Sequence, residues 1–414
     1  MIPLKSNRTE KRSNIRLRIS FLLPALLSIA IYFRSDIMKA SSIQKGGDDL
    51  KKVISAAAAI ILILSVLAGC AAGKNEPAVI KAVSPVEETV GIHTFSQRMF
   101  LNGSASMVGI YAYGQSEKSR PKPIAFEWDY NGKDDAQFTL SISENADMTD
   151  AISYSTNETE YSVYNLKIGT EYYWTVSDGE QESEIASFST DSSAPRNLYI
   201  DGVTNARDLG GRETENGTVT KQGMIFRTGR LNESNIDHVN IEITESGKHV
   251  MLEELGIKTE IDVRLVDDSE NGGITNSPLG ESVAYISIPM EWDGNMLADN
   301  KEQVVKVFSV LAKEENYPLF IHCNIGTDRT GMLAFMINAL LGVPEEELQK
   351  DYVFSNFGNI GGKRPVENLL ESDYYNTIMQ TEGGTLSEKT YNCLVDTGVP
   401  AEDLDALIRI MTAG

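Results

Sequence analysis

The sequence predicts an all-β sandwich domain followed by an α/β domain, whose central and mostly parallel sheet is flanked by helices. Three observations lead to this fold class. Apolar residues alternate with period two between about residues 88 and 190, as in half-buried strands. After residue 198, strand-like and helix-like patterns alternate along the chain. Near residue 323, an apolar run turns directly into a helical pattern and carries a cysteine and an arginine.

Composition limits the partners that this chain can have. It carries 59 acidic and 37 basic side chains, a formal net charge of −22. Nucleic acids and anionic membrane surfaces bind basic stripes and repel a chain with this excess of negative charge, so we expect no nucleic-acid partner. Three cysteines provide no disulfide framework. The sequence shows no repeats, no Walker loop and no cysteine–histidine cluster with metal-ligand spacing, so we expect no cofactor and no metal. The oligomeric state stays open.

The segment 50–70 has the layout of a secretory signal. An apolar run, Val53 to Ala68, follows Lys51-Lys52 and ends in Leu67-Ala-Gly-Cys70. This run is short for a membrane span, which needs about 20 residues, and its basic, apolar and small-residue order is that of an export signal. Leu-Ala-Gly-Cys resembles the bacterial lipobox. The resemblance implies lipidation of Cys70, a polar tether over residues 71–87, and an exported protein anchored to the extracellular face of the membrane.

Residues 1–49 contain a second apolar run and many basic residues. Two export signals in series make little physical sense. Lys45-Gly-Gly-Asp-Asp49 back-translates to a purine-rich stretch that reads as a ribosome-binding site, and translation would then begin at the codon for Leu50. We therefore interpret 1–49 as a mis-assigned leader outside the working protein; the nucleotide sequence of the gene tests this.

The segment 88–190 predicts the β-sandwich. Phe138-x-Leu140-x-Ile142 and Tyr172-x-Trp174-x-Val176 alternate as strands do, and turn signals such as Asn131-Gly132 separate them. The run from Tyr161 to Val176 resembles the late strands of a fibronectin type III module. Tyr154, Tyr161 and Tyr164 form either a ligand platform or, as we favour, ordinary strand-face packing. The polar residues 191–197 read as a linker to the domain at 198–414.

Alternating elements in the C-terminal half predict a βαβ arrangement. Thr259–Arg264 and Tyr285–Pro289 read as buried strands. Residues 300–313 form a helical pattern with one apolar face, made by Val304, Val307, Phe308 and Leu311. This helix leads into the apolar run before Cys323. In open α/β sheets, ligands bind at the carboxyl ends of the strands, where Cys323 is expected to lie.

The strand-to-helix turn Ile321-His-Cys-Asn-Ile-Gly-Thr-Asp-Arg-Thr-Gly331 carries the chemistry. Backbone N–H groups at a helix N-terminus form an anion site, and such a field favours the thiolate form of a cysteine in the turn. Arg329 adds a planar, two-pronged donor that matches phosphate oxygens. Nucleophile, anion cradle and guanidinium together indicate phosphate-ester hydrolysis through a cysteinyl-phosphate.

This turn resembles the cysteine-dependent protein tyrosine phosphatases, and more narrowly the bacterial branch with the loop His-Cys-x-x-Gly-Lys-Asp-Arg-Thr-Gly. The resemblance implies that Cys323 attacks phosphorus, Arg329 clamps the phosphate and Thr330 helps the thiolate leave. The intervening loop residues would bind the phosphate: Asn324, Ile325, Gly326 and Thr327. Further stretches extend the resemblance over about 198–414: Thr204 to Gly211, Phe226 to Leu231, Lys258 to Arg264 and Asp351 to Asn356.

Three arginines stand at or just after strand-like runs: Arg207, Arg227 and Arg264. They either converge on the anion or pair with acidic neighbours as structural bridges. One position departs from the family pattern, since Thr327 replaces the loop lysine. Without this second cation, activity on polyanionic lipids is in doubt, whereas phosphotyrosine, with one phosphate on a flat ring, is less affected.

Two aspartates compete for the role of general acid, which is worth about 10²–10⁴ in rate. Asp328 matches the aspartate proposed as acid in the bacterial branch, and we favour it. Asp293, before Gly294, stands about where the mobile acid loop of the wider superfamily falls. His322 is expected to hold the loop and the thiolate without transferring a proton to substrate.

Three functions stay open. The first is a surface-anchored phosphatase that acts on phosphotyrosine; phosphoserine and phosphothreonine are further candidate substrates of the same enzyme. The second is a phosphatase of inositol phosphates or other small phosphate esters. The third is a non-catalytic, phosphate-binding or adhesive lipoprotein, which the intact nucleophile and arginine disfavour. The expected partners are accordingly a phosphorylated protein or small ester, and the membrane through the lipid on Cys70.

Overall fold

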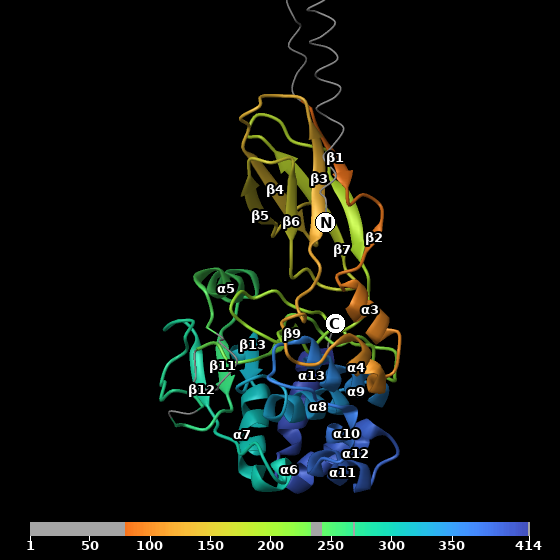
Figure 1. Ribbon diagram of the computed structural model, residues 1–414, viewed down its shortest axis with the longest axis vertical. Helices are drawn as coiled ribbons and strands as arrows, with labels where there is room; N and C mark the ends of the chain where they lie inside the picture. Colours follow the sequence, from red (N-terminus) through yellow and green to blue (C-terminus); the bar gives the residue numbers. More distant parts are fainter. Residues whose placement is uncertain (1–78, 233–241, 268–269, 413–414) are drawn as a thin grey trace, which may run out of the picture. The chain divides into compact units, whose positions relative to one another are not determined.

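The computed structural model describes residues 79–232, 242–267 and 270–412, all within one compact unit, Pro77–Gly414 (Figure 1). The predicted leader, export signal and lipidation site at Cys70 lie outside the described residues. Among the helices of the described ranges, none combines the length and apolar character needed to cross a membrane. Part of the predicted tether is structured, since Ile80–Ser84 forms strand β1 and pairs with β3, Ile124–Tyr130.

Two β-sheets make up the N-terminal region. The first has the order β1-β3-β6 and the second the order β2-β8-β7-β4-β5. Their strands, after β1, are β2 Thr89–Val90, β3 Ile124–Tyr130, β4 Phe138–Ser143, β5 Ile152–Thr156, β6 Glu160–Val163, β7 Glu171–Ser177 and β8 Ala186–Thr190. Neighbouring strands are antiparallel except for β2 and β8.

The two sheets share one hydrophobic core, as the predicted alternation requires. Phe138, Leu140 and Ile142 are buried on β4, and Trp174 on β7 packs edge-on against Phe126 of the other sheet, with ring centroids 5.2 Å apart. Residues of period two point to one face of a strand, which is why these side chains meet. The finer resemblance to a fibronectin type III module stays a prediction.

The segment 95–112 differs from the predicted all-β domain. It forms α3 Phe95–Leu101, the 3₁₀ turn Ala105–Met107 and α4 Val108–Tyr111. Thr94 and Gln97 close a capping box that begins α3. Phe100 and Val108 are buried in the core of the C-terminal region, where the Phe100 ring lies 5.6 Å from that of Phe357. This segment, though it precedes most sandwich strands, therefore completes the C-terminal core.

A five-stranded sheet of order β12-β11-β13-β10-β9 forms the centre of the C-terminal region. The strands are β9 Arg207–Asp208, β10 Ile225–Thr228, β11 Thr259–Asp262, β12 Ala284–Ser287 and β13 Leu319–His322. All pairs are parallel except β9 with β10, in agreement with the predicted, mostly parallel sheet. The fully buried β13 lies centrally, between β11 and β10.

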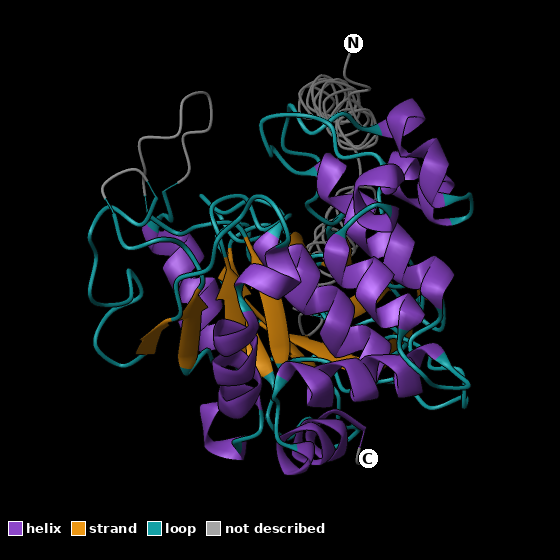
Figure 2. Cartoon of the chain, turned by 90° about the horizontal axis from the view of Figure 1, so that it is seen from below, coloured by secondary structure: helices purple, strands orange, loops and turns teal. Residues whose placement is uncertain are grey.

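Helices cover the sheet, and Figure 2 shows how densely they gather on one side. Val304, Val307, Phe308 and Leu311 are buried on α7, as the helical pattern predicts. The helices of this region are α5 Glu245–His249, α6 Met296–Asp299, α7 Lys301–Leu311, α8 Arg329–Leu340, α9 Glu345–Phe354, α10 Val366–Leu370, α11 Asp373–Gln380, α12 Leu386–Thr397 and α13 Ala401–Thr412. Every residue of α8 is buried, so the helix after the cysteine loop is anchored along its whole length.

Candidate active site

The cysteine loop joins the end of β13 to the start of α8. Cys323 directly follows β13, and α8 begins at Arg329, so the loop 323–328 lies at the N-terminus of a helix. Gly326 has a φ of +68°, and a Cβ there would meet the Thr228 oxygen at 2.3 Å. Only glycine fits both the conformation and the space. The sequence thus forms a tight turn at the carboxyl edge of the sheet.

Carbonyl groups of this loop are held by donors outside it. The oxygen of Asn324 accepts from the Arg230 N–H at 3.0 Å. The Asn205 side-chain amide donates to the oxygens of Ile325 and Gly326, at 3.0 and 3.1 Å. In a trans peptide the N–H points opposite to the C=O. The N–H groups that follow these carbonyls therefore face the other side of the loop, as a phosphate cradle requires.

Arg329 is oriented by a carboxylate that the sequence did not single out. Its Nη1 and Nη2 donate to the two oxygens of Glu270, at 2.7 and 3.1 Å, and Nη1 also donates to the Met290 oxygen. Burial disfavours the guanidinium charge, but the negative charges of Cys323 and Glu270 outweigh it and raise the pKa of Arg329. Arg329 is thus a fully charged group with a fixed plane beside the cysteine.

Three buried polar atoms on the loop and the first turn of α8 lack partners among the described residues. They are Arg329 Nε, Thr330 Oγ1 and Asn324 Oδ1. Glu270 occupies the Nη1–Nη2 edge of the guanidinium, so the Nε side is the one left for another ligand. A buried donor without a partner is costly. An oxyanion at the loop would satisfy the N–H of Arg329 and the hydroxyl of Thr330.

His322 lies on the same face of β13 as Phe320, and the two rings stack with their centroids 5.5 Å apart. Its Nε2 lies 2.8 Å from a Glu260 oxygen and its Nδ1 lies 3.2 Å from the Cys323 oxygen. Glu260, Asp262 and His322 are buried with their ligand atoms within 4.8 Å of one another, so tertiary structure creates a carboxylate cluster that the sequence did not predict. Arg264 supplies a positive charge there, since its guanidinium donates to both oxygens of Asp262.

The structure places Arg207, Arg227 and Arg264 in buried ion pairs. Arg264 binds Asp262, as above, while Arg207 and Arg227 bind Asp351 of α9, at 2.8 and 2.6 Å. These contacts are those of structural bridges, and phosphate binding by the three arginines stays a prediction. Arg227 also donates to the Gly326 oxygen at 2.6 Å and so supports the loop from outside.

Asp351 is the carboxylate at the centre of this cluster, and Arg212 binds it as well, at 2.6 Å. Burial alone would raise the pKa of Asp351, but the charges of Arg207, Arg212 and Arg227 hold it well below its usual range. Burial and the charge of Arg227 in turn lower the pKa of Arg207 to about 10. The cluster ties α9 to the strands that support the cysteine loop.

The two candidate acids lie in different surroundings. Asp328, immediately before α8, forms an ion pair with Arg364, whose Nε and Nη2 lie 3.1 and 3.3 Å from its two oxygens. Asp293 is exposed, beside Trp292, which is 54% exposed, and Gly294, whose φ is +69°. The structure thus places Asp328 on the cysteine loop itself and Asp293 on an open turn.

Sequence reasoning missed three residues that contact the candidate site: Asn205, Glu270 and Arg364. Each reaches the loop from a distant part of the chain. Asn205 stands within the stretch Thr204 to Gly211 that carried the family resemblance, which is the one signal that could have found it. Its left-handed backbone, with a φ of +59°, is visible only in the structure. Glu270 and Arg364 follow no periodic pattern, so the sequence offered no signal for them.

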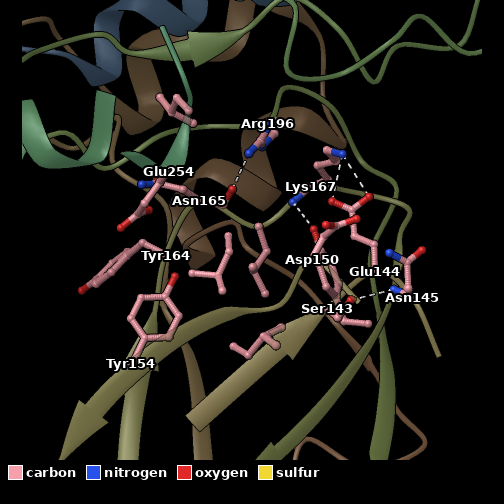
Figure 3. Close-up of a pocket in the computed structure, with 15 residues that line it drawn as sticks. Ser143, Glu144, Asn145, Asp150, Tyr154, Tyr164, Asn165, Lys167, Arg196 and Glu254 are labelled. Carbon is pink, nitrogen blue, oxygen red and sulfur yellow. Dashed lines mark hydrogen bonds and ion pairs between the residues drawn. The ribbon is translucent and has the colours of Figure 1, made fainter. Parts of the chain in front are cut away.

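A cavity of about 360 Å³ lies apart from the cysteine loop (Figure 3). Both of its basic side chains are paired with carboxylates, Lys167 with Glu144 at 2.8 Å and Arg196 with Asp208 at 2.9 Å. Tyr154 and Tyr164 lie at one side of it. Tyr154 also stacks on Tyr161, with ring centroids 5.2 Å apart, as expected for strand-face packing.

Residues 198–392 match the sequence model described as the tyrosine phosphatase family. The C-terminal half carries a tyrosine phosphatase family domain. Among curated proteins, the chain is similar to one from Cupriavidus necator whose name places it among the tyrosine-protein phosphatases. The two are 24% identical over 187 residues, covering 39% of this chain and 64% of that protein. It is also similar to a tyrosine-protein phosphatase of Nostoc commune, 30% identical over 82 residues, covering 20% of this chain and 25% of the relative.

Among solved structures, the chain is similar to the core catalytic domain of the PP-IP phosphatase SIW14 from S. cerevisiae in complex with citrate. The identity is 15% and the TM-score 0.26, with 36% of this chain and 82% of the other covered. The chain spans less than two thirds of the length of the curated relatives that it matches.

Proposed function

We propose that the tyrosine phosphatase family domain hydrolyses phosphate monoesters, with phosphotyrosine in proteins as its first substrate. The observation that carries this proposal is the orientation of Arg329. Glu270 holds one edge of its guanidinium, while the Nε–H stays buried without a partner beside the loop of Cys323. A guanidinium held in this way is preorganised for phosphate oxygens, because its side chain need not reorient when they bind.

The reaction follows from these positions. The Cys323 sulfur attacks phosphorus and forms the S–P bond while the P–O bond to the leaving group breaks. The leaving oxygen takes a proton from a carboxylic acid. Water then attacks the cysteinyl-phosphate, the S–P bond breaks, and the acid regains its proton from that water. Thr330, whose hydroxyl is buried without a partner, donates to the departing sulfur. The products are the alcohol and inorganic phosphate.

Replacement of the nucleophile tests the mechanism. Cys323→Ser is expected to abolish turnover of phenyl phosphate, because the serine hydroxyl is not ionised at neutral pH. It should still bind vanadate or sulfate, since the loop amides and Arg329 are unchanged. Titration calorimetry and steady-state rates measure the two quantities. Cys393→Ser, a change to the other buried thiol of the described chain, serves as the control. Hydrolysis by Cys323→Ser at the wild-type rate would rule out the cysteinyl-phosphate.

We propose Asp328 as the general acid, because it lies on the loop, and Asp293 as the alternative. The acid matters most when the leaving group is poor. The variant of the true acid should lose much more activity on phenyl phosphate than on a fluorinated ester with a better leaving group. Asp328→Asn and Asp293→Asn are compared in the same assay. Equal losses on both esters would exclude the residue concerned.

The substrate itself is tested with a panel of phosphotyrosine and phosphoserine peptides, inositol phosphates and phosphoinositides. A preference for phosphotyrosine supports the proposal, and a preference for inositol phosphates supports the alternative.

We also propose that the protein is exported and held to the membrane by a lipid on Cys70. Incorporation of labelled palmitate that is lost in Cys70→Ala tests the anchor; equal labelling of both proteins would contradict it.

A further inference from the structure

A group of buried charged side chains on the central sheet takes no part in the proposed reaction. Glu260 and Asp262 lie on β11, His322 lies beside Asp262 on β13, and Arg264 follows β11. All of them are 0% exposed. Taking a charge out of water is costly unless it is paired and hydrogen-bonded. Such a cluster therefore has to balance its own charges.

Within this cluster, Glu260 depends on His322. Arg264 donates to both oxygens of Asp262, at 2.7 to 3.1 Å, and the Tyr285 hydroxyl donates to Asp262 as well, at 2.8 Å. Oε1 of Glu260 lies 2.8 Å from His322 Nε2, whereas its Oε2 is buried without a partner among the described residues. Asp262 is thus satisfied by other groups. In the described part of the chain, His322 is the basic group within ion-pair distance of Glu260.

The contacts of His322 indicate its protonation state. Its Nε2 faces a carboxylate oxygen of Glu260, and its Nδ1 faces the carbonyl oxygen of Cys323 at 3.2 Å. A carbonyl or an ionised carboxylate can only accept, so each ring nitrogen has to carry a hydrogen. A neutral imidazole carries one such hydrogen and an imidazolium carries two. His322 therefore satisfies both neighbours as the imidazolium, and with Arg264 it balances the charges of the two carboxylates.

The surroundings of the His322 ring agree with a positive charge. Burial alone would raise the pKa of Asp262, but the charges of His322 and Arg264 outweigh it and lower that pKa. From β10 the neighbour of His322 is Thr228, which carries no charge, and the ring that stacks on it is that of Phe320. The imidazole thus meets carboxylates from β11 and uncharged residues from β10 and β13.

This charge stands next to the nucleophile in the chain. Cys323 directly follows His322, and its own carbonyl accepts the Nδ1–H. A positive charge near a cysteine favours the thiolate, which is the form that attacks phosphorus. We propose that Glu260 is a positioning residue that keeps His322 protonated and thereby keeps Cys323 reactive in mildly acidic solution. This inference deepens the proposed phosphatase function and rests on it for its effect on turnover.

Alkylation of Cys323 by iodoacetamide tests the proposal without requiring turnover. Its rate is measured from about pH 5 to 8, where activated cysteines ionise, by mass spectrometry of the peptide that contains Cys323. Glu260→Gln keeps an acceptor oxygen but cannot balance a charge. Its midpoint pH should rise by about one unit, so that alkylation below the midpoint slows about tenfold. Glu260→Asp keeps the charge and should shift the midpoint less, and Glu253→Gln, the same change at an exposed glutamate, should leave it unchanged.

A second variant shows whether Glu260 acts through His322. His322→Asn keeps a donor for the Cys323 carbonyl but carries no charge, so it should shift the midpoint as far as Glu260→Gln does. The double variant should shift it no further. The acid limb of kcat/KM for phenyl phosphate should move by the same amount. A loss of activity at every pH with an unchanged alkylation midpoint would mean that Glu260 only supports the fold, which overturns the proposal.

Nitrogen-15 NMR of the wild-type histidine ring keeps the proposal testable if the variants do not fold. An imidazolium gives two similar nitrogen shifts, whereas a neutral ring gives two that lie far apart, and His322→Gln serves to assign the signal. A neutral His322 at neutral pH overturns the proposal. If Cys323 responds to Glu260→Gln as expected but the wild-type chain hydrolyses no phosphate ester, the phosphatase function fails and the link between Glu260 and Cys323 stands.

Discussion

Glu270 offers the sharpest test of how this site is organised. It is 8% exposed and holds Arg329 through two hydrogen bonds of 2.7 and 3.1 Å. Glu270→Gln keeps the shape of the side chain and one acceptor oxygen, but it removes the negative charge and the second acceptor. Nη1 of Arg329 retains the oxygens of Val263 and Met290, at 3.3 and 3.0 Å. The guanidinium should therefore stay in place but lose its fixed orientation.

The size of the effect follows from the lost interaction. A hydrogen bond to a charged group contributes about 1.5–3 kcal/mol. If that free energy orients Arg329 for the transition state, then kcat/KM for phenyl phosphate falls about 10- to 150-fold, since about 1.36 kcal/mol corresponds to a factor of ten. Glu270→Asp keeps the charge on a shorter side chain and should restore part of the rate.

Steady-state kinetics measure this effect, with urea unfolding as a check that each variant is folded. Glu281→Gln, the same change at an exposed glutamate of the domain, is the matched control and should leave kcat/KM unchanged. A double-mutant cycle with Arg329→Lys gives the coupling between the two side chains. Full activity of Glu270→Gln, or additive losses in the cycle, would show that Glu270 does not orient Arg329.

Two further predictions concern the support of the loop. Asp351→Asn leaves three buried arginines without their carboxylate and should lower the free energy of unfolding by about 3–5 kcal/mol, against little change for the exposed Asp134→Asn. Because the folded protein depresses the pKa of Asp351 from 3.8, its contribution is complete above that value and is lost as pH falls below it. The stability difference between wild type and Asp351→Asn in urea should therefore shrink in acid, and a constant difference would contradict the cluster. Gly326→Ala should lower kcat/KM about a hundredfold, because the methyl group would meet the Thr228 oxygen. Gly217→Ala, at a φ of +82° with nothing within 4 Å, isolates the backbone strain alone and should keep its activity.

Several elements were predictable because they depend on neighbours along the chain. The alternation around Leu140 and Trp174 matches two buried strands, and the apolar face of Val304 and Phe308 matches α7. The helical segment around Phe100 was missed, because it is short and interrupts a run of strands. Its apolar residues are buried by contacts with α9 and the turn after it, such as Phe354 and Phe357, which no local pattern reveals.

The candidate site divides in the same way. The sequence by itself determined the composition of the loop. Cys323, Gly326 and Arg329 lie within one turn, and this spacing is enough to place a nucleophile next to an anion site. Only the tertiary structure decided which partner each arginine has. Arg207, Arg227, Arg264, Arg329 and Arg364 are chemically alike in the sequence, yet four are held by buried carboxylates and one by a carboxylate near solvent. The reason is physical: an ion pair forms between groups that folding brings together, and these partners come mostly from strands, helices and loops far apart in the chain.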